Sequence, residues 1–318
     1  MFRKSIAIAV MLIATISFAS SALAAWPERP VRFVLGSQAG SSIDMMGRII
    51  AQKLSDRFGQ PFVVNNVSGG GLGGFPMTMK NAKGDGYTIG LGADSFFSYN
   101  SLDSNAKFTI DDFEYLCTIF VGDLSYVTTP DKPWKDVREA FEWSKQTGNT
   151  INYMFQTSMD RAITELYARQ MGAKLNMIPS TGPSAILTSL MGGHADIGYS
   201  GGLHYEQARA GKIKTLSLFL EEPSKNYPDV ALVKDLFDPY YPSALNYRII
   251  VAPKGFPQEA KDKLVAALEE IITSEEFREV VEDKLHFIVD YKDSDALTLM
   301  IHDQYEAHRR IIEEVSKK

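Results

Sequence analysis

The feature that most constrains the fold of this chain is the alternation of short apolar runs with helical runs along most of its length. Each apolar run has the length and residue types of a strand, and residues 163–171 and 264–272 carry clear helical stripes. Such alternation is typical of α/β architecture. We expect strands at residues 31–35, 61–67, 87–93, 114–122, 125–130, 150–155, 174–179, 195–200, 213–219, 247–253 and 286–291.

The N-terminal segment has the organisation of a secretory signal peptide. Arg3 and Lys4 precede an apolar run over residues 5–18, and Ala22–Ala24 forms a small-residue cleavage site. The apolar run is short for a membrane span. We therefore expect residues 1–24 to be removed on export, with cleavage near Ala24.

Charge and cysteine content narrow the possible classes of protein. The formal net charge is −6, and it becomes −8 once Arg3 and Lys4 are removed. An acidic chain without basic runs argues against nucleic acids and anionic membrane surfaces as partners. Cys117 is the only cysteine, so no internal disulfide can form, and we expect it to be buried as a small apolar residue.

Two extended segments that contain proline, residues 125–134 and 247–257, are the expected domain breaks. They predict a discontinuous first domain of residues 25–127 and 250–318, and a second domain of residues 128–249. A ligand cleft is then expected between the two lobes, where strand ends and helix N-termini meet.

The loop after the first strand, "GSQAGSSID" over residues 36–44, is a candidate anion site. Small residues before a helix leave backbone N–H groups uncovered, and the helix dipole favours a negative charge there. Its glycines do not match a P-loop or a dinucleotide fingerprint. The alternative is an ordinary helix cap, in which Ser42 or Asp44 accepts helix N–H bonds. We favour a carboxylate site.

A second glycine-rich stretch, Gly69–Gly74, contains G-x-G-x-x-G, and Asp94 follows about twenty residues later. We do not expect a nucleotide site, because the next helical run is short, the preceding strand is the second one, and the protein is exported. Asp94 and Ser95 end the third strand, and Phe96, Phe97 and Tyr99 follow. Such aromatic residues are usually core residues, but we expect at least one to face the cleft.

The second domain repeats the order of strand, polar loop and helix. Thr157 and Ser158 lie where a helix begins, and Arg161 falls in its first turn, where the helix dipole disfavours a cation. Arg161 therefore pairs with Asp160 or Glu165, or it binds a ligand carboxylate. Two further loops carry Thr181, Gly182 and Ser184 before one helix, and Tyr199 and Ser200 after a strand.

The sequence carries little that indicates catalysis. It has no G-x-S-x-G elbow, its five histidines show no metal-ligand spacing, and no tight pair of carboxylates ends a strand. We expect no catalytic residue, no metal and no cofactor. A secreted hydrolase that uses Ser95 or Ser158 with a distant histidine is the alternative from another class.

Several segments together resemble the solute-binding receptors of tripartite tricarboxylate transporters, the Bug family. They are "WPERPVRFVL", "AGSSID", "AQKLSDRFGQPFVVNNVSGGGLGG", "KGDGYTIGLG", "LTSLMGGHADIGY", "ARAGKIKTLSLF" and "APKGFPQEAKDKLVAALEEI". The resemblance implies a two-lobed α/β periplasmic-binding-protein fold, type II-like, with a ligand cleft between lobes joined by two crossing strands. It also implies a periplasmic location, a small organic acid as ligand and integral-membrane permease subunits as partners.

The chain departs from the family pattern at its loops. The first loop usually reads "PFPAGGGTD", whereas this chain keeps Asp44 and gains serines. Arg161 stands where a histidine is common, and Ser180 replaces the usual tyrosine. An aspartate common after "ADIGY" is missing, with Ser200 nearby.

From these features we expect a monomeric receptor that captures a small organic carboxylate, either an aromatic acid or a dicarboxylate, without altering it. It would deliver this ligand to a membrane permease; a receptor for a membrane sensor kinase is the alternative. The predicted ligand-binding residues are Ser37, Gln38, Ala39, Ser41, Ser42, Asp44, Asp94, Ser95, Phe96, Tyr153, Phe155, Thr157, Ser158, Arg161, Thr181, Gly182, Tyr199 and Ser200.

Overall fold

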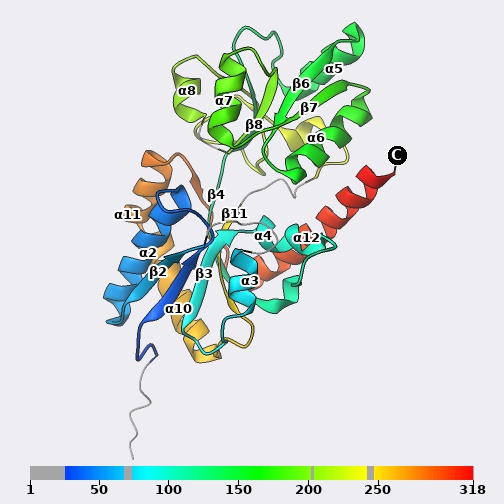
Figure 1. The fold of residues 1–318 in the computed structure, drawn as a ribbon. Helices are drawn as coiled ribbons and strands as arrows, with labels where there is room; N and C mark the ends of the chain where they lie inside the picture. The colour runs from blue at the N-terminus through cyan, green and yellow to red at the C-terminus, as the bar shows by residue number, and fades with distance from the viewer. Residues whose placement is uncertain (1–25, 68–73, 202–203, 242–246, 318) are drawn as a thin grey trace, which may run out of the picture.

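The computed structural model describes residues 26–67, 74–201, 204–241 and 247–317, and these residues form two six-stranded sheets (Figure 1). The strand order is β12-β4-β11-β3-β1-β2 in the first sheet and β10-β9-β5-β8-β6-β7 in the second. Helices cover both faces of each sheet. We call each sheet with its helices the first lobe and the second lobe. The α/β class and the two-lobed fold expected from the sequence are confirmed.

The first sheet consists of β1 (Val31–Leu35), β2 (Phe62–Asn66), β3 (Thr88–Ala93), β4 (Phe113–Val121), β11 (Tyr247–Pro253) and β12 (Ile288–Val289). The second consists of β5 (Leu124–Thr128), β6 (Thr150–Phe155), β7 (Lys174–Pro179), β8 (Ile197–Gly201), β9 (Lys214–Leu218) and β10 (Ala231–Leu232). The helices are α2 (Ser42–Phe58), α3 (Phe75–Lys80), α4 (Ser95–Ser98), α5 (Val137–Thr147), α6 (Ser158–Met171), α7 (Pro183–Met191), α8 (Tyr205–Arg209), α9 (Val233–Leu236), α10 (Gln258–Thr273), α11 (Glu275–Arg278) and α12 (Ser294–Ser316). Short 3₁₀ turns at Asn100–Leu102 and Ile110–Asp112 and a π-helical turn at Glu279–Lys284 complete the list.

Apolar stripes on the helices form the cores of the two lobes. In the first lobe, α2 and α10 bury their stripes on one face of the sheet, and α3, α4 and the start of α12 cover the other face. In the second lobe, α5 and α6 share a core on one face, and α7 packs on the opposite face. Cys117 is buried in the first-lobe core, as expected.

The topology brings the carboxyl ends of the strands in the two lobes to facing edges. In the first sheet β1, β2 and β3 are parallel and β11 is antiparallel to β3 and β4, so β1 to β4 all end where β11 begins. In the second sheet β6, β7 and β8 are parallel and β5 is antiparallel to β8, so the three end where β5 begins. Since only Gly122 and Asp123 separate β4 from β5, these two edges lie close together.

The same connection shows where the chain changes sheets. The chain passes from the first sheet to the second between Val121 and Leu124, and it returns to the first sheet between β10 and β11. The domain boundaries expected at residues 127/128 and 249/250 stay a prediction.

Helix α12 contacts both lobes. Leu297 and Ile301 lie in the first-lobe core, whereas Ile311 lies in the core of the second lobe. Figure 1 shows the C-terminal part of the helix reaching α6, and Arg169 of α6 donates a hydrogen bond to the carbonyl of Lys317. Asp293 is the N-cap, accepting a bond from the Ala296 N–H at 2.9 Å. Ser294, which is also a residue type able to cap, is already the first residue of the helix.

Some sequence expectations fall outside the described residues. They are the signal peptide at residues 1–24 and most of the glycine-rich stretch, residues 69–73. Within the part of the chain that the structure describes, no helix combines the length and apolar character needed to cross a bilayer.

The packing of α7 against β8 depends on Gly198. A Cβ at this position would lie 2.2 Å from Cγ2 of Ile186 on α7, much closer than van der Waals contact. Gly198→Ala is expected to lower the free energy of unfolding by about 1–3 kcal/mol, measured by urea denaturation. Gly122→Ala is the matched control, because its Cβ would meet only Phe287 at 3.9 Å. Equal stability of the two variants would contradict this account of the packing.

Candidate functional site

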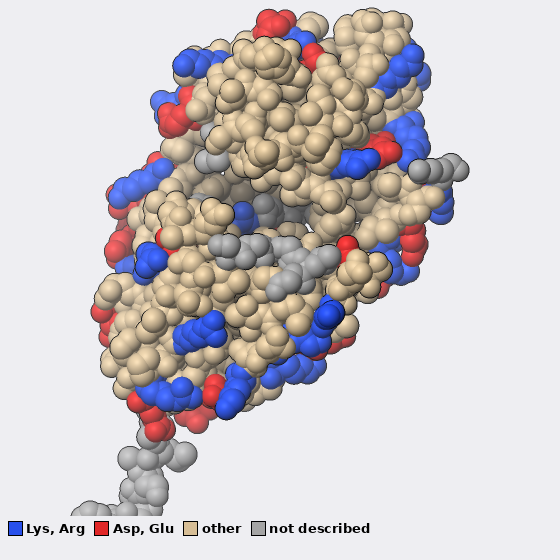
Figure 2. Space-filling model, viewed as in Figure 1, with Lys and Arg blue, Asp and Glu red and all other residues tan. Residues whose placement is uncertain are grey.

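The loops that follow the strands lie on the two facing edges, and they carry most of the predicted site residues. In the first lobe, residues 36–41 follow β1 and Asp94 follows β3. In the second lobe, residues 156–157 follow β6 and residues 180–182 follow β7. Figure 2 shows the surface hollowed between the two lobes. This hollow is the candidate ligand cleft.

The predicted residues differ in how far they reach the surface. Exposed residues are Gln38, Ala39, Thr157, Ser158, Arg161 and Thr181. Partly buried residues are Ser37, Ser41, Ser95, Phe96, Phe155 and Gly182, and buried residues are Asp44, Asp94, Tyr153, Tyr199 and Ser200. Ser42 begins α2, and its side chain lies outside the described atoms.

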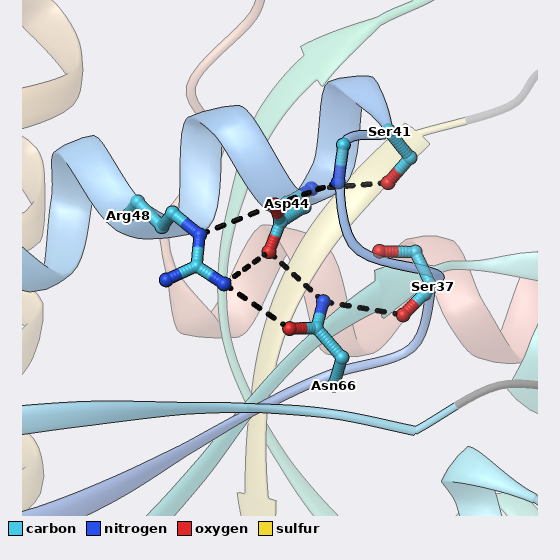
Figure 3. A network of polar contacts seen from close by, with 6 residues as sticks. Ser37, Ser41, Asp44, Arg48 and Asn66 are labelled. Atoms are coloured by element: carbon cyan, nitrogen blue, oxygen red, sulfur yellow. Dashed lines mark hydrogen bonds and ion pairs between the residues drawn. The ribbon is translucent and has the colours of Figure 1, made fainter.

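Asp44 holds the first loop in place (Figure 3). Its carboxylate accepts hydrogen bonds from the Gly40 N–H at 2.9 Å, from Asn66 Nδ2 at 2.9 Å and from Arg48 Nε at 3.1 Å. Asn66 also donates to the carbonyl of Ser37 at 3.3 Å. The hydrogen bond from Arg48, and then the bond from the Gly40 N–H, lowers the pKa of Asp44 to about 2. The carboxylate is therefore ionised and organises the backbone on both sides of the turn.

The cap of α2 is Ser41, whereas the alternative interpretation of this loop names Ser42 or Asp44 as the cap. The Ser41 hydroxyl accepts a bond from the Asp44 N–H at 3.2 Å, because Ser41 still has extended backbone where the helix begins. This bond accounts for one of the N–H groups that a helix N-terminus cannot pair internally. The Asp44 side chain instead reaches back to Gly40.

Among the buried hydroxyls without a hydrogen-bond partner in the described part of the chain, two follow strand ends at the cleft edges. They are the hydroxyl of Ser37 in the first lobe and the hydroxyl of Ser180 in the second lobe. Buried polar atoms are nearly always paired with protein, water or ligand. Both serines follow strand ends that border the cleft, so each is a candidate ligand contact.

Asp94 is buried at the end of β3. Its carboxylate accepts bonds from the Ser95 N–H at 2.7 Å and from Gln304 Nε2 on α12 at 2.8 Å. Burial raises its pKa to about 6, although these hydrogen bonds and the nearby Arg248 act in the opposite direction. Phe96 lies two residues after Asp94, and a Cβ on Gly36 or Gly92 would lie 3.1 Å from its ring. Phe96 thus packs between the end of β3 and the first loop.

The second-lobe loop is organised by a buried aspartate in the same way. Thr157 caps α6 in a capping box with Asp160, which accepts from the Gln156 N–H at 2.9 Å and from the Tyr153 hydroxyl at 3.2 Å. Tyr153, predicted to contact the ligand, is fully buried in the second-lobe core. This placement makes it a support for Asp160.

Arg161 has neither of the partners considered for it from the sequence. Asp160 is engaged in the capping box, and Glu165 pairs with Arg169 at 3.8 Å. Within the described ranges no carboxylate lies within ion-pair distance of Arg161. Its guanidinium carbon lies 5.6 Å from the centroid of the Phe155 ring. This cation at the second-lobe edge is available to a ligand.

Packing shows that the two edges approach each other, because Tyr99 of the first lobe packs against the core of the second lobe. Burial raises the pKa of Tyr99, with a contribution from the charge of Asp160 in the second lobe. Burial likewise raises the pKa of Tyr199 in the second lobe, and the charge of Asp94 in the first lobe acts in the same direction.

The serine–histidine contacts do not resemble a hydrolase site. His204 contacts the Ser200 hydroxyl at 2.9 Å and the Ser125 hydroxyl at 3.3 Å, but all three residues are buried. Burial lowers the pKa of His204 to about 4. Across the described residues, Ser95 and Ser158 have no histidine in hydrogen-bond contact, and no cluster of three or more His, Cys, Asp or Glu side chains is arranged to hold a metal.

A separate shallow groove lies between α2 and α10, away from the cleft edges. It is bridged by the ion pairs Lys53–Glu276 at 2.5 Å and Arg57–Glu270 at 2.6 Å. Its charges are thus already compensated, and we do not assign it a ligand.

Several residues that build the site were not singled out from the sequence. Arg48 and Asn66 position Asp44, Gln304 positions Asp94, and Arg248 on β11 lies beside Asp94. Of these residues, only Arg248 could have been recognised from the sequence, because it is a charged residue within the apolar run "YRIIVAP" and a buried charge without a partner is costly.

Comparison with known proteins agrees with this geometry. The family model described as "Tripartite tricarboxylate transporter family receptor" matches residues 46–317. Protein BugT of Bordetella pertussis is 30% identical over 261 residues, which cover 79% of each chain.

Two solved structures show the same fold. An R. palustris protein with adipate is 19% identical, with a TM-score of 0.74, covering 91% of this chain and 98% of its own. MatC from Rhodopseudomonas palustris with bound malate is 20% identical, with a TM-score of 0.72, covering 90% of this chain and all of its own. The resemblance inferred from the sequence motifs is thus confirmed: the chain belongs to the receptor family of tripartite tricarboxylate transporters.

Proposed function

We propose that this protein is a periplasmic receptor that binds a small organic acid between its lobes and delivers it to a membrane permease. Residues 1–24 would direct export and be removed near Ala24, and the receptor would act as a monomer without chemical change to the ligand. The domains would be residues 25–127 with 250–318, and residues 128–249, closing on the ligand like a hinge.

The observation that carries the proposal is the pair of facing loops, each organised by a buried aspartate. Asp44 accepts a hydrogen bond from the Gly40 N–H and so fixes the loop that leads into the N-terminus of α2. Asp160 accepts a bond from the Gln156 N–H and fixes the loop before α6 in the same way. Helix N-termini attract anions. Two such termini on facing edges suit a ligand with a carboxylate at each end.

The side chains around these loops support the same ligand class. Ser37 and Ser180 supply one buried hydroxyl in each lobe, and Arg161 supplies a cation in the second lobe. Phe96 and Phe155 are partly buried beside the loops and would cover an apolar middle of the ligand. Adipate and malate, found on the two structural neighbours, are acids of this kind.

A thermal-shift screen of the protein purified from the periplasm tests the proposal. The panel contains short and long dicarboxylates, tricarboxylates, acidic amino acids and aromatic acids. Each acid is compared with the amide in which its carboxylates are neutral. An acid at a hundred times its Kd should stabilise the fold by about 2.7 kcal/mol, while the amide should do little. Stabilisation by a sugar, an amine or a nucleotide, and by none of the acids, would refute the proposal.

A receptor that signals to a membrane sensor kinase would use the same site. Co-purification from detergent-solubilised membranes distinguishes the two partners, and we expect permease subunits to be recovered with the acid-loaded protein. Recovery of a kinase alone would favour the sensing role.

A further inference from the structure

The first lobe contains a basic side chain to which the proposed function assigns no role. Arg248 is the second residue of β11, within an otherwise apolar strand. It pairs in register with Ala93 at the end of β3 and with Phe120 near the end of β4. Arg248 therefore lies at the carboxyl edge of the first sheet, next to Asp94 and close to the crossing between the lobes.

The position of Arg248 along β11 places it on the same face of the sheet as α2. Alternate residues of a strand share a face, and Ile250 and Ala252 belong to the core that α2 covers. The guanidinium carbon lies 5.9 Å from the centroid of Phe120, which belongs to the same core. The cation thus lies on the face from which residues 36–41 enter α2.

Arg248 brings a positive charge to the carboxyl edge of the first sheet, beside the negative charge of Asp94. Burial lowers the pKa of Arg248, and the charge of Asp94 acts in the opposite direction. The Asp94 carboxylate is itself shared with Ser95 and Gln304. A guanidinium stays charged in a protein, and a buried charge is stabilised by opposite charges and hydrogen bonds. A ligand carboxylate at this edge of the sheet would be attracted by the guanidinium.

Arg48 and Lys292 also lie near this edge, each beside a carboxylate at another position. Arg48 is about half exposed, and it binds Asp44 at 3.0 Å and Asn66 at 3.3 Å. Lys292 pairs with Asp290 at 2.6 Å and lies 5.1 Å from the ring of Tyr247, on the opposite face of β11. Arg161 belongs to the second lobe.

We propose that Arg248 determines specificity at the first-lobe end of the ligand, binding a carboxylate there in preference to a neutral group. This inference rests on the proposed function, and it names the residue that reads the charge of one end of the acid. Arg161 would bind the other end.

Calorimetric titration of the periplasmic protein tests the inference. The probes are straight-chain dicarboxylates from malonate to adipate, each compared with its half-amide, in which one end is neutral. The wild-type protein should bind a preferred dicarboxylate about 10- to 100-fold more tightly than its half-amide, since a charge-assisted bond is lost. In Arg248→Met this preference should disappear, because the half-amide places its one carboxylate on Arg161.

Two further variants keep the test sharp. Arg248→Lys retains a cation beside Asp94 but loses the planar guanidinium, so it should keep the preference for the dicarboxylate over its half-amide with weaker affinity. This variant replaces Arg248→Met in the test if circular dichroism shows that the Met variant is unfolded. Arg32→Met is the matched control, because Arg32 is exposed on β1 and bonds only to Asn65 at 2.9 Å among the described residues.

The possible failures are distinguishable. Unchanged affinity and preference in both Arg248 variants would overturn this inference and leave the proposed function standing. If the wild-type protein binds none of the dicarboxylates or any other acid of the panel, the proposed function fails and the inference fails with it.

Discussion

Replacing Asp44 by alanine is expected to lower the free energy of unfolding by about 2–3 kcal/mol and to weaken ligand binding at least tenfold. The change leaves the Gly40 N–H without its acceptor and leaves the Asn66 amide only the Ser37 carbonyl, and the first loop loses the group that sets its turn. Urea denaturation and calorimetric titration measure the two effects. Asp56→Ala on the exposed face of α2, where Asp56 bonds to Gln52, is the control and should change stability by less than about 0.5 kcal/mol.

The lowered pKa of Asp44 also predicts how the free energy of unfolding depends on pH. The pKa of Asp44 is lowered in the folded state from 3.8 to about 2. Its contribution is therefore complete above about pH 5 and is lost as the pH falls through about 4 towards 2. The stability curves of the wild type and Asp44→Ala should converge over this interval. Parallel curves from pH 7 to pH 2 would contradict the role assigned to the carboxylate.

Replacing Arg161 by alanine is expected to weaken binding of the acid about 10- to 100-fold while leaving the ligand-free protein as stable as before, or slightly more stable. The loss reflects one charge-assisted contact. The unchanged stability follows because Arg161 is exposed in the first turn of α6, where the helix dipole disfavours a cation. Titration with the acid that stabilises the protein most in the panel measures the affinity, and thermal melting without ligand measures the stability.

Arg169→Ala is the matched control for this experiment. Arg169 lies in the last turn of the same helix and bonds to Glu165 and to the carbonyl of Lys317, away from the cleft. Its loss should affect stability slightly and affinity hardly at all. Equal affinity of Arg161→Ala and the wild type would remove Arg161 from the site.

Most of the fold could be predicted from local sequence. Strands buried on both faces read as continuous apolar runs, and the runs at residues 31–35, 150–155 and 247–253 match β1, β6 and β11. Helix ends were less certain, since Ser41 and Asp293 cap α2 and α12, each next to a residue that is also able to cap. Choosing among adjacent polar residues requires the backbone angles, which the residue types do not specify.

The candidate site could be predicted only in part. Ser37 to Asp44 and Thr157 to Arg161 are contiguous segments that lead into α2 and α6, and their composition indicates which polar groups they present. The residues that position them come from distant parts of the chain: Asn66 is 22 residues from Asp44, and Gln304 is 210 residues from Asp94. Tyr153 shows the opposite case, because an aromatic residue at a strand end has the same pattern whether it faces the cleft or the core.

The sequence by itself determined the α/β class, the family and the two loops that precede α2 and α6, because these depend on hydrophobic periodicity and on contiguous motifs. Only the tertiary structure decided that Asp44 organises the first loop, that Asp94 is held by α12, and that Arg248 lies beside Asp94 at the crossing. Those relations depend on the strand order β4-β11-β3 and on a helix that returns from the end of the chain. Contacts between residues far apart in sequence leave no local pattern, so they arise only when the chain is folded.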